Sequence, residues 1–171
     1  MHPLRKLISD KKLLGSIAQE YGTPVYIYSQ QRIEENVSSL KNALSANFDK
    51  FHICYAIKSN SNPHLIKAMR NSFSKIGGDC SSPGEIYAAE LSGIKPSECI
   101  YTGNYESDAD LIEAVQKGCN INLDDITSLD RLSKITIPDR ISFRMNPGFG
   151  GGSYSGIITG GRDAKFGIPA E

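Results

Sequence analysis

Apolar residues recur along the chain in two alternating patterns, one typical of strands and the other typical of helices. Short runs rich in β-branched and aromatic residues predict strands at residues 24–29, 52–57, 75–80, 99–102, 120–123 and 140–145. Between these runs, apolar residues spaced three and four apart predict helices at residues 30–46, 65–73, 83–91, 107–118 and 126–135. The predicted order is therefore an alternation of strand and helix.

Residues typical of helix ends mark most of these boundaries. Pro63 stands at a first helical position, where the N–H that proline lacks has no partner within the helix. Ser82 begins the sequence Ser-Pro-Gly-Glu, which is a capping-box pattern, and Ser107 is a second predicted cap. Gly93 and Gly118 follow apolar periodic segments and predict where two helices end.

Apart from the first strand, five strands alternate with helices and are joined by short turns. Repeats of this βα kind imply a parallel sheet, so the predicted fold class is α/β. A complete (β/α)8 barrel typically needs about 250 residues, whereas this chain has 171. Pattern alone leaves two possibilities open, a partial (β/α)8 barrel of about five βα units or a small open sheet. Residues 146–161 are rich in Gly, Ser and Thr and predict a long functional loop.

Composition excludes several classes of function. Nineteen basic residues balance nineteen acidic ones without a run of like charge, which gives no support to a nucleic-acid or anionic-membrane partner. Apolar stretches are far shorter than the roughly 20 residues that cross a bilayer, and the N-terminus lacks the apolar core of a signal peptide. A cytoplasmic location is therefore expected. The four cysteines are far apart in sequence, which predicts small buried residues and neither a disulfide nor a metal site.

Lys58 is the first candidate for chemistry, because it ends an apolar predicted strand. Its ammonium would then lie at the carboxyl edge of the sheet, where the active sites of barrels are found. A lysine there can form an imine with an aldehyde if desolvation frees its amine. Position alone is also consistent with a lysine whose charged end reaches solvent at a strand end.

Four other polar residues need a role or an explanation. Asp79 closes the next predicted strand at the same edge, where turn and cap chemistry is the simpler interpretation. Arg144 lies within an apolar predicted strand, and a buried arginine needs an acidic or anionic partner. Residues 124–125 are two aspartates that suit helix capping better than a metal. The glycines of the 146–161 loop fit no phosphate-loop pattern.

The segment at residues 55–62, Tyr-Ala-Ile-Lys-Ser-Asn-Ser-Asn, resembles the Y-A-x-K-A-N-x-N signature of fold-type III pyridoxal-phosphate decarboxylases. Further segments agree with this family in order and spacing, at residues 21–26, 79–85, 102–104, 121–124, 144–148, 159–160 and 165–168. The resemblance extends from Tyr21 to Ile168, and it is to the diaminopimelate decarboxylase branch.

This resemblance implies a barrel of the alanine-racemase type that binds pyridoxal 5'-phosphate and is followed by a β-rich domain. Lys58 matches the catalytic lysine that binds the cofactor covalently, and Asp79 matches an aspartate near it. Arg144 matches an arginine that approaches the phenolic oxygen of the cofactor ring. Lys165 matches a position near the subunit interface, so a homodimer is expected.

The implied reaction removes the α-carboxylate of an amino acid as carbon dioxide, and in the diaminopimelate branch it converts meso-diaminopimelate to lysine. Tyr154 stands where that branch usually has histidine, so a related basic amino acid or a carboxylated polyamine precursor would fit as well. The segments at 79–85 and 165–167 argue against an amino-acid racemase. A non-catalytic homologue that binds the cofactor or regulates a partner is a further possibility.

Family members are longer than this chain, which predicts its domain organisation. Residues 1–29 would lead into the barrel, and residues 30–171 would form the N-terminal part of the pyridoxal-phosphate-binding barrel domain. The histidine that stacks on the cofactor ring, the glycine-rich phosphate segment and the acid that pairs with the pyridine nitrogen would all follow Glu171. We therefore expect residues 1–171 alone to have little or no decarboxylase activity.

Overall fold

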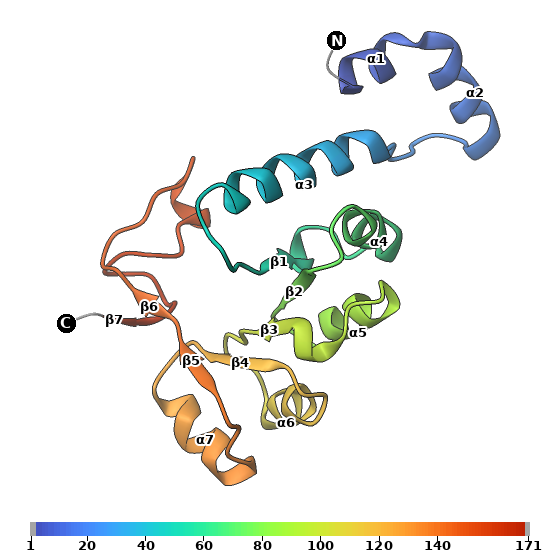
Figure 1. The fold of residues 1–171 in the computed structure, drawn as a ribbon. Helices are drawn as coiled ribbons and strands as arrows, with labels where there is room; N and C mark the ends of the chain where they lie inside the picture. Colours follow the sequence, from blue (N-terminus) through green and yellow to red (C-terminus); the bar gives the residue numbers. More distant parts are fainter. Residues whose placement is uncertain (1–2, 170–171) are drawn as a thin grey trace. The chain divides into compact units, whose positions relative to one another are not determined.

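Five strands form one parallel sheet in the computed structural model of the chain, which describes residues 3–169. The strands are β1 (Ile53–Ala56), β2 (Ile76–Cys80), β3 (Cys99–Tyr101), β4 (Asn120–Leu123) and β5 (Ile141–Phe143). They lie side by side in chain order, and each neighbouring pair is parallel (Figure 1). The predicted α/β class with a parallel sheet is confirmed.

The described residues divide into two compact units, one of residues 3–51 and 64–75 and one of residues 52–63 and 76–169. The first unit contains helices, which are α1 (Pro3–Ser9), α2 (Lys11–Tyr21), α3 (Gln30–Ser45) and, except for its first residue, α4 (Pro63–Ser72). The rings of Phe51 and Phe73 stack in this unit, with centroids 5.9 Å apart. The helices predicted at 30–46 and 65–73 are confirmed, whereas α1 and α2 were not predicted.

The strand predicted at residues 24–29 is wrong, because in the described part of the chain these residues belong to no strand of either sheet. Val25, Tyr26 and Ile27 are 41%, 89% and 37% exposed. A β-prone run becomes a strand only where a neighbouring strand accepts its hydrogen bonds and packs against its side chains. The apolar pattern of this segment therefore indicated a strand propensity, but the tertiary structure places no strand of the described residues beside it to form the hydrogen bonds.

Helices of the second unit follow three of the strands, as predicted. They are α5 (Pro83–Leu91) after β2, α6 (Asp108–Gln116) after β3 and α7 (Thr127–Ile135) after β4. Short 3-10 helices are also present, namely η1 (Ile57–Ser59), η2 (Pro96–Glu98) and η3 (Ser155–Ile157). Helix α5 packs against β2 and α6 against β4, and each helix buries small or branched apolar side chains.

The two faces of the sheet differ in character because side chains alternate along each strand. Tyr101, Ile121 and Leu123 are 1%, 2% and 3% exposed and form part of the core. The positions between them on neighbouring strands are polar and less buried, as Asp79 and Asn122 show. The apolar face is therefore the one covered by helices, and the other face is the one on which polar groups gather.

Helix ends follow the predicted signals with one change. The Ser82 hydroxyl accepts the N–H of Glu85 at 3.3 Å, but the Glu85 carboxylate accepts from the N–H of Ser81 at 2.9 Å instead of closing the box at Ser82. Ser107 and Asp110 form a complete capping box at the start of α6. Two predicted terminators have left-handed backbones, Gly93 with φ +83° and Gly118 with φ +82°.

The strand predicted at residues 140–145 is interrupted at Arg144. β5 ends at Phe143, and β6 (Met145–Asn146) pairs instead with β7 (Ile168–Pro169) in a separate parallel ribbon. The N–H of Arg144 donates to the carbonyl of Leu123 at 2.9 Å, whereas its own carbonyl accepts from Ile168 at 2.8 Å. The backbone thus changes its hydrogen-bond partner at this residue, so Arg144 lies at a junction between strands and not inside one.

Asn146 joins the two ends of the long loop that the sequence predicted. Its Nδ2 donates to the carbonyl of Gly161, and its Oδ1 accepts from the N–H groups of Gly148 and Gly161, each at 3.0 Å. Asn146 is 6% exposed, so these bonds satisfy a buried amide. The loop therefore has a defined closure although most of its residues lie outside helices and strands.

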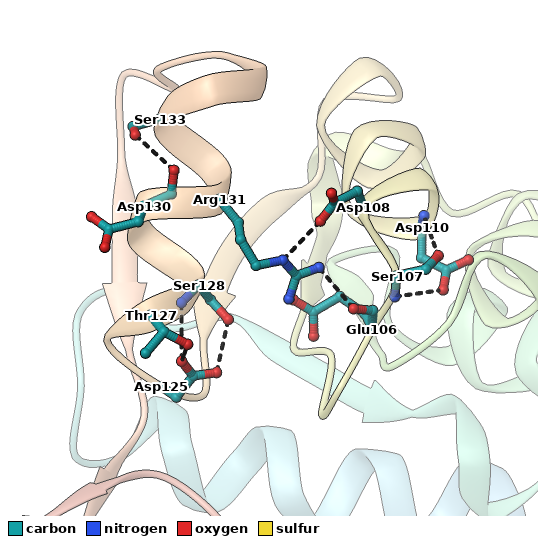
Figure 2. A network of polar contacts seen from close by, with 10 residues as sticks. All are labelled: Glu106, Ser107, Asp108, Asp110, Asp125, Thr127, Ser128, Asp130, Arg131 and Ser133. Atoms are coloured by element: carbon teal, nitrogen blue, oxygen red, sulfur yellow. Dashed lines mark hydrogen bonds and ion pairs between the residues drawn. The ribbon is translucent and has the colours of Figure 1, made fainter.

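Figure 2 shows the polar contacts that join α6 to α7. Arg131 on α7 donates from Nε to the Asp108 carboxylate and from Nη2 to the Glu106 carbonyl, each at 2.8 Å. Its Nη1 lies 3.5 Å from the Glu106 carboxylate, which is 6% exposed. Burial raises the pKa of Glu106 above its usual value. Arg131 therefore holds the segment that precedes α6 against α7.

All four cysteines are free, and Cys80, Cys99 and Cys119 are buried as predicted. Burial raises the pKa of Cys119 to about 12, which keeps this thiol protonated near neutral pH. Between residues 3 and 169, no group of three or more histidine, cysteine or acidic side chains is arranged to hold a metal ion. None of the helices in the described residues is both long enough and apolar enough to cross a bilayer.

Asp125 caps α7, and its replacement tests this cap. The N–H and hydroxyl of Ser128 donate to its carboxylate at 3.0 and 2.8 Å, and the hydroxyl of Thr127 donates as well. Hydrogen bonds from Thr127 and then Ser128 lower the pKa of Asp125. Asp125→Ala should lower the free energy of unfolding by about 1 kcal/mol at pH 7, measured by urea denaturation.

The effect of this substitution should depend on pH. Because the folded state lowers the pKa, the carboxylate stabilises the fold above its unfolded value of about 3.9, and this contribution is lost as the pH falls through the folded value. The difference between wild type and Asp125→Ala should therefore shrink in acid. Asp139→Ala removes an exposed aspartate and is the control; equal losses from both substitutions at pH 7 would contradict the assignment.

Candidate active site

Lys58 lies in η1, one turn beyond the carboxyl end of β1. The residue before it, Ile57, is fully buried and anchors this turn. The Lys58 side chain is 64% exposed and can therefore move, but the described residues do not supply the desolvation that would free its amine. The predicted place of Lys58 at the carboxyl edge of the sheet is confirmed, except that it follows the strand and does not end it.

Asp79 lies beside Lys58 because the sheet pairs their strands in register. Ala56 of β1 is opposite Asp79 of β2, and Lys58 is two residues beyond Ala56. The Lys58 Nζ and Asp79 Oδ2 atoms are 3.8 Å apart, and the Asp79 side chain is 35% exposed. A pair this accessible contributes less than about 1 kcal/mol to stability. Its effect is to direct the amine toward the polar face of the sheet.

Arg144 has the acidic partner that a half-buried guanidinium requires. Its Nη1 donates to Oδ1 of Asp124 at 3.2 Å, and the Asp124 side chain is only 7% exposed. The ring of Phe166 lies below the guanidinium, 4.7 Å from its central carbon. Arg144 is therefore held from two sides, by a carboxylate and by an aromatic face.

Asp124 belongs to the site through its contact with Arg144, whereas its place in the sequence suggested strand-end solvation or helix capping. A signal for its role was present, because the predicted neighbouring strands end at Leu123 and in the segment that contains Arg144. The register places Leu123 opposite Phe143, so the next residue of each strand end is Asp124 or Arg144. Pairing the arginine with the nearest carboxylate on the adjacent strand would have identified it.

Lys58, Asp79 and Arg144 meet in one cavity of ≈ 470 Å³. Most of its lining residues are polar or charged, and besides these three they are Ser81, Thr102, Asn104, Asn122, Thr159 and Phe166. All six stand within the segments that resemble the decarboxylase family, although no individual role was predicted for them. A larger cavity lies at the β6–β7 ribbon, and in the described part of the chain Arg162 is its only charged lining residue.

Hydrogen bonds cross the polar face of the sheet next to Lys58. The Ser142 hydroxyl donates to Oδ1 of Asn122 at 2.8 Å, and Nδ2 of Asn122 donates to the Thr102 hydroxyl at 3.1 Å. Asn104 is different, since its Nδ2 is buried and has no partner between residues 3 and 169. A buried donor without an acceptor is costly unless a bound molecule supplies one.

The cavity thus combines a primary amine, a fixed guanidinium and an unpaired amide donor. An accessible amine can bond covalently to an aldehyde, whereas a guanidinium and an amide N–H bind anionic or carbonyl oxygens. Cavities of about 300–1,000 Å³ suit small molecules and cofactors. The arrangement therefore fits a ligand that carries both an aldehyde and anionic oxygens.

A family model described as pyridoxal-dependent decarboxylase, pyridoxal binding domain, matches residues 30–171. The chain belongs to this family. Pyridoxal phosphate is the family's cofactor, as the sequence predicted. It has an aldehyde for the amine of Lys58 and a phenolic oxygen for a donor such as Arg144, so the residues of the cavity fit it.

Relatives of this decarboxylase family cover nearly all of the chain. The diaminopimelate decarboxylase of Methanothermobacter thermautotrophicus is 42% identical over 154 residues, which are 89% of this chain and 35% of the relative. That of Thermoplasma acidophilum is 39% identical over 158 residues, or 92% of this chain and 38% of the relative. The chain thus spans well under half the length of these relatives.

Solved structures agree with the sequence comparison. The crystal structure of diaminopimelate decarboxylase from Helicobacter pylori complexed with L-lysine has a TM-score of 0.82 and 30% identity, and the match covers 91% of this chain and 40% of that one. The order of five consecutive parallel βα units, together with this likeness, favours the predicted partial (β/α)8 barrel over a small open sheet.

Removing Asp124 tests whether it holds Arg144 in place. Asp124→Ala leaves a half-buried guanidinium without its carboxylate, which should lower the free energy of unfolding by about 2 kcal/mol. Asp163→Ala, at an exposed position of the same unit, should change it by less than about 0.5 kcal/mol.

A double-mutant cycle separates the ion pair from the loss of a side chain. Adding Arg144→Met to Asp124→Ala should restore part of the stability, because the methionine has no charge that needs a partner. Urea unfolding of the four proteins measures the coupling. Strictly additive losses would show that the two side chains do not act as a pair.

Proposed function

We propose that this chain belongs to a pyridoxal-phosphate-dependent amino-acid decarboxylase, most like those that convert meso-diaminopimelate to lysine and carbon dioxide. The observation that carries this proposal is the meeting of Lys58, Asp79 and Arg144 in one cavity of a pyridoxal-binding chain. Because the chain spans 35% and 38% of the two relatives described, the activity is proposed for the whole protein. Residues 30–171 would form the first part of the barrel domain, and residues 1–29 would lead into it.

Lys58 is proposed as the catalytic residue that binds the cofactor covalently. Its exposure supports this role, since a lysine side chain that is 64% exposed can reach a ligand in the cavity and move again. Asp79 attracts the ammonium group of Lys58 and so directs Nζ toward the cavity while no ligand occupies it. The same carboxylate lines the cavity and would be one of the groups that hold the cofactor.

Arg144 is proposed to donate to the phenolic oxygen of the cofactor. Its guanidinium lines the cavity, and Asp124 and Phe166 prevent it from turning away. When bound, the pyridoxal ring accepts the electron pair that remains after the α-carboxylate leaves as carbon dioxide. The protein's contribution in these described residues is to orient the ring through Lys58 and Arg144.

A related substrate is a second candidate, and Tyr154 is the observation that favours it. The diaminopimelate branch usually has histidine at this position of the loop, whereas Tyr154 is a larger neutral residue that is 66% exposed. Another basic amino acid or a carboxylated polyamine precursor would then be the substrate. Release of carbon dioxide from a panel of amino acids distinguishes these, and release from none would favour a non-catalytic homologue that binds the cofactor.

A homodimer in the cytoplasm is also proposed. Lys165, which resembles an interface position of the family, lies over the rings of Tyr105 and Phe166 with its Nζ 5.5 and 5.2 Å from their centroids. Tyr105 is 81% exposed and so leaves an aromatic surface available for a second subunit. The absence of any excess charge in the sequence is consistent with a small-molecule enzyme.

Replacing Lys58 tests the proposed function directly. The wild-type protein mixed with pyridoxal phosphate should give a violet-absorbing adduct that borohydride reduction traps on Lys58, as peptide mass spectrometry would show. Lys58→Ala should lose the adduct and any carbon dioxide release, because it lacks the amine. Lys134→Ala, which alters an exposed lysine on α7, should keep both. An adduct of equal yield on Lys58→Ala would refute the assignment.

A further inference from the structure

A row of hydrogen-bonded side chains crosses β5, β4 and the end of β3, and two of its members, Asn122 and Thr102, line the cavity. Resting on the proposed function, we infer that this row makes Thr102 a hydrogen-bond donor to an anionic oxygen of the bound ligand. Asn122 and Ser142 are positioning residues in this inference, since they act through Thr102. None of the three belongs to the proposed covalent and charged groups of the site.

The direction of the row follows from the orientation of the Asn122 amide, whose Oδ1 lies toward Ser142 and whose Nδ2 lies toward Thr102. The Ser142 hydroxyl is 2.8 Å from Oδ1 of Asn122 but 3.4 Å from the carbonyl of Ile121. Its single hydrogen is therefore committed to Asn122, whose amide oxygen faces β5. The amide nitrogen of Asn122 then faces β3, where it donates to Oγ1 of Thr102 at 3.1 Å.

This direction leaves Thr102 with a free hydrogen. Its oxygen accepts from Asn122, so its own O–H must point to another acceptor. No side chain or backbone group between residues 3 and 169 accepts that hydrogen, and Thr102 lines the cavity. The backbone N–H of Thr102 donates to the carbonyl of Cys80 at 2.8 Å, which fixes the residue at the end of β3.

A second donor stands next to it. Asn104 follows Thr102 by two residues, lines the same cavity and has a buried Nδ2 without a partner in the described part of the chain. Two residues after β3 that line the cavity with Lys58 and Arg144 thus each have a donor without an acceptor in the described residues. The carboxylates beside the two cations are already paired, Asp79 with Lys58 and Asp124 with Arg144.

The chemistry that satisfies this set is an anionic oxygen. Neutral donors beside two cations bind a phenolate or carboxylate oxygen more strongly than a neutral acceptor, because hydrogen bonds to a charged group are stronger. Such an oxygen could belong to the ring of the cofactor or to the carboxylate of the amino acid. The two sources differ in when they enter the cavity, so they can be distinguished by experiment.

Thr102→Val tests the donor, because valine has the shape of threonine without its hydroxyl. Loss of one hydrogen bond to a charged oxygen should weaken binding by about tenfold. Thr102→Ser, which keeps the hydroxyl, should stay within about threefold of wild type. Thr136→Val makes the same change at an exposed site on the end of α7 and should have no effect.

Two measurements identify the source of the oxygen. Titration with pyridoxal phosphate alone, followed by absorbance, gives the affinity for the cofactor. If Thr102 donates to the cofactor ring, this affinity is lower in Thr102→Val than in wild type. In the whole protein, a raised KM for meso-diaminopimelate with unchanged cofactor affinity indicates the carboxylate instead. If Thr102→Val and Thr102→Ser both have the wild-type affinity for pyridoxal phosphate and the wild-type KM, the inference is overturned.

Asn122→Asp tests the direction of the row. A carboxylate has no N–H to donate, so the Thr102 hydroxyl would turn toward it and away from the ligand. In the wild-type background, the substitution should weaken binding of the ligand that Thr102 contacts by about tenfold. In the Thr102→Val background the effect should be distinctly smaller, because that variant has no hydroxyl that can turn. Equal effects in both backgrounds would show that Asn122 does not act through Thr102.

Failure of this inference is distinguishable from failure of the proposed function. If wild-type protein forms no adduct on Lys58, the proposed function fails. If the adduct forms normally and Thr102→Val binds both ligands as wild type does, only the donor role of Thr102 fails. Thermal unfolding of each variant shows whether a loss of binding comes from a loss of fold.

Discussion

The register of the parallel sheet is the constraint on which the site depends. Backbone hydrogen bonds place Ala56 opposite Asp79 and Leu123 opposite Phe143. Because side chains alternate with a period of two, this register directs apolar side chains to the helices and polar ones to the opposite face. A shift of one residue in any strand would exchange the two sets. The hydrophobic core and the cavity therefore result from the same hydrogen bonds.

The two cations of the cavity are held in different ways, and the difference suits their proposed roles. Lys58 is 64% exposed and lies 3.8 Å from its carboxylate, so its amine can leave that partner at little cost. Arg144 lies 3.2 Å from a carboxylate that is 7% exposed and rests on the ring of Phe166. The first arrangement allows a group to react and return, whereas the second keeps a donor in one orientation.

Sequence reasoning succeeded wherever local signals and tertiary structure agreed. The caps at Ser82 and Ser107 and the glycine at Gly118 mark helix ends in the structure, because each satisfies backbone groups within a few residues. It failed at residues 24–29, which have the composition of a strand but no neighbouring strand in the described residues. It also placed Arg144 inside a strand, because a change of backbone partner leaves no trace in hydrophobic pattern.

What the sequence by itself determined is the identity of the elements and of the residues able to react. The alternation of two periods implied a parallel α/β fold, and the segment around Lys58 implied pyridoxal phosphate. Periodicity and motif are both patterns of residues that lie close together in the sequence, so they can be read without the tertiary structure. The pairing of Asp124 with Arg144 left a signal in the order of the strand ends that only the tertiary structure turned into a contact, and only the tertiary structure decided that Thr102, Asn122 and Ser142 form a directed row. Those contacts join residues about twenty apart in sequence, and they exist because strand pairing brings their side chains to one face of the sheet.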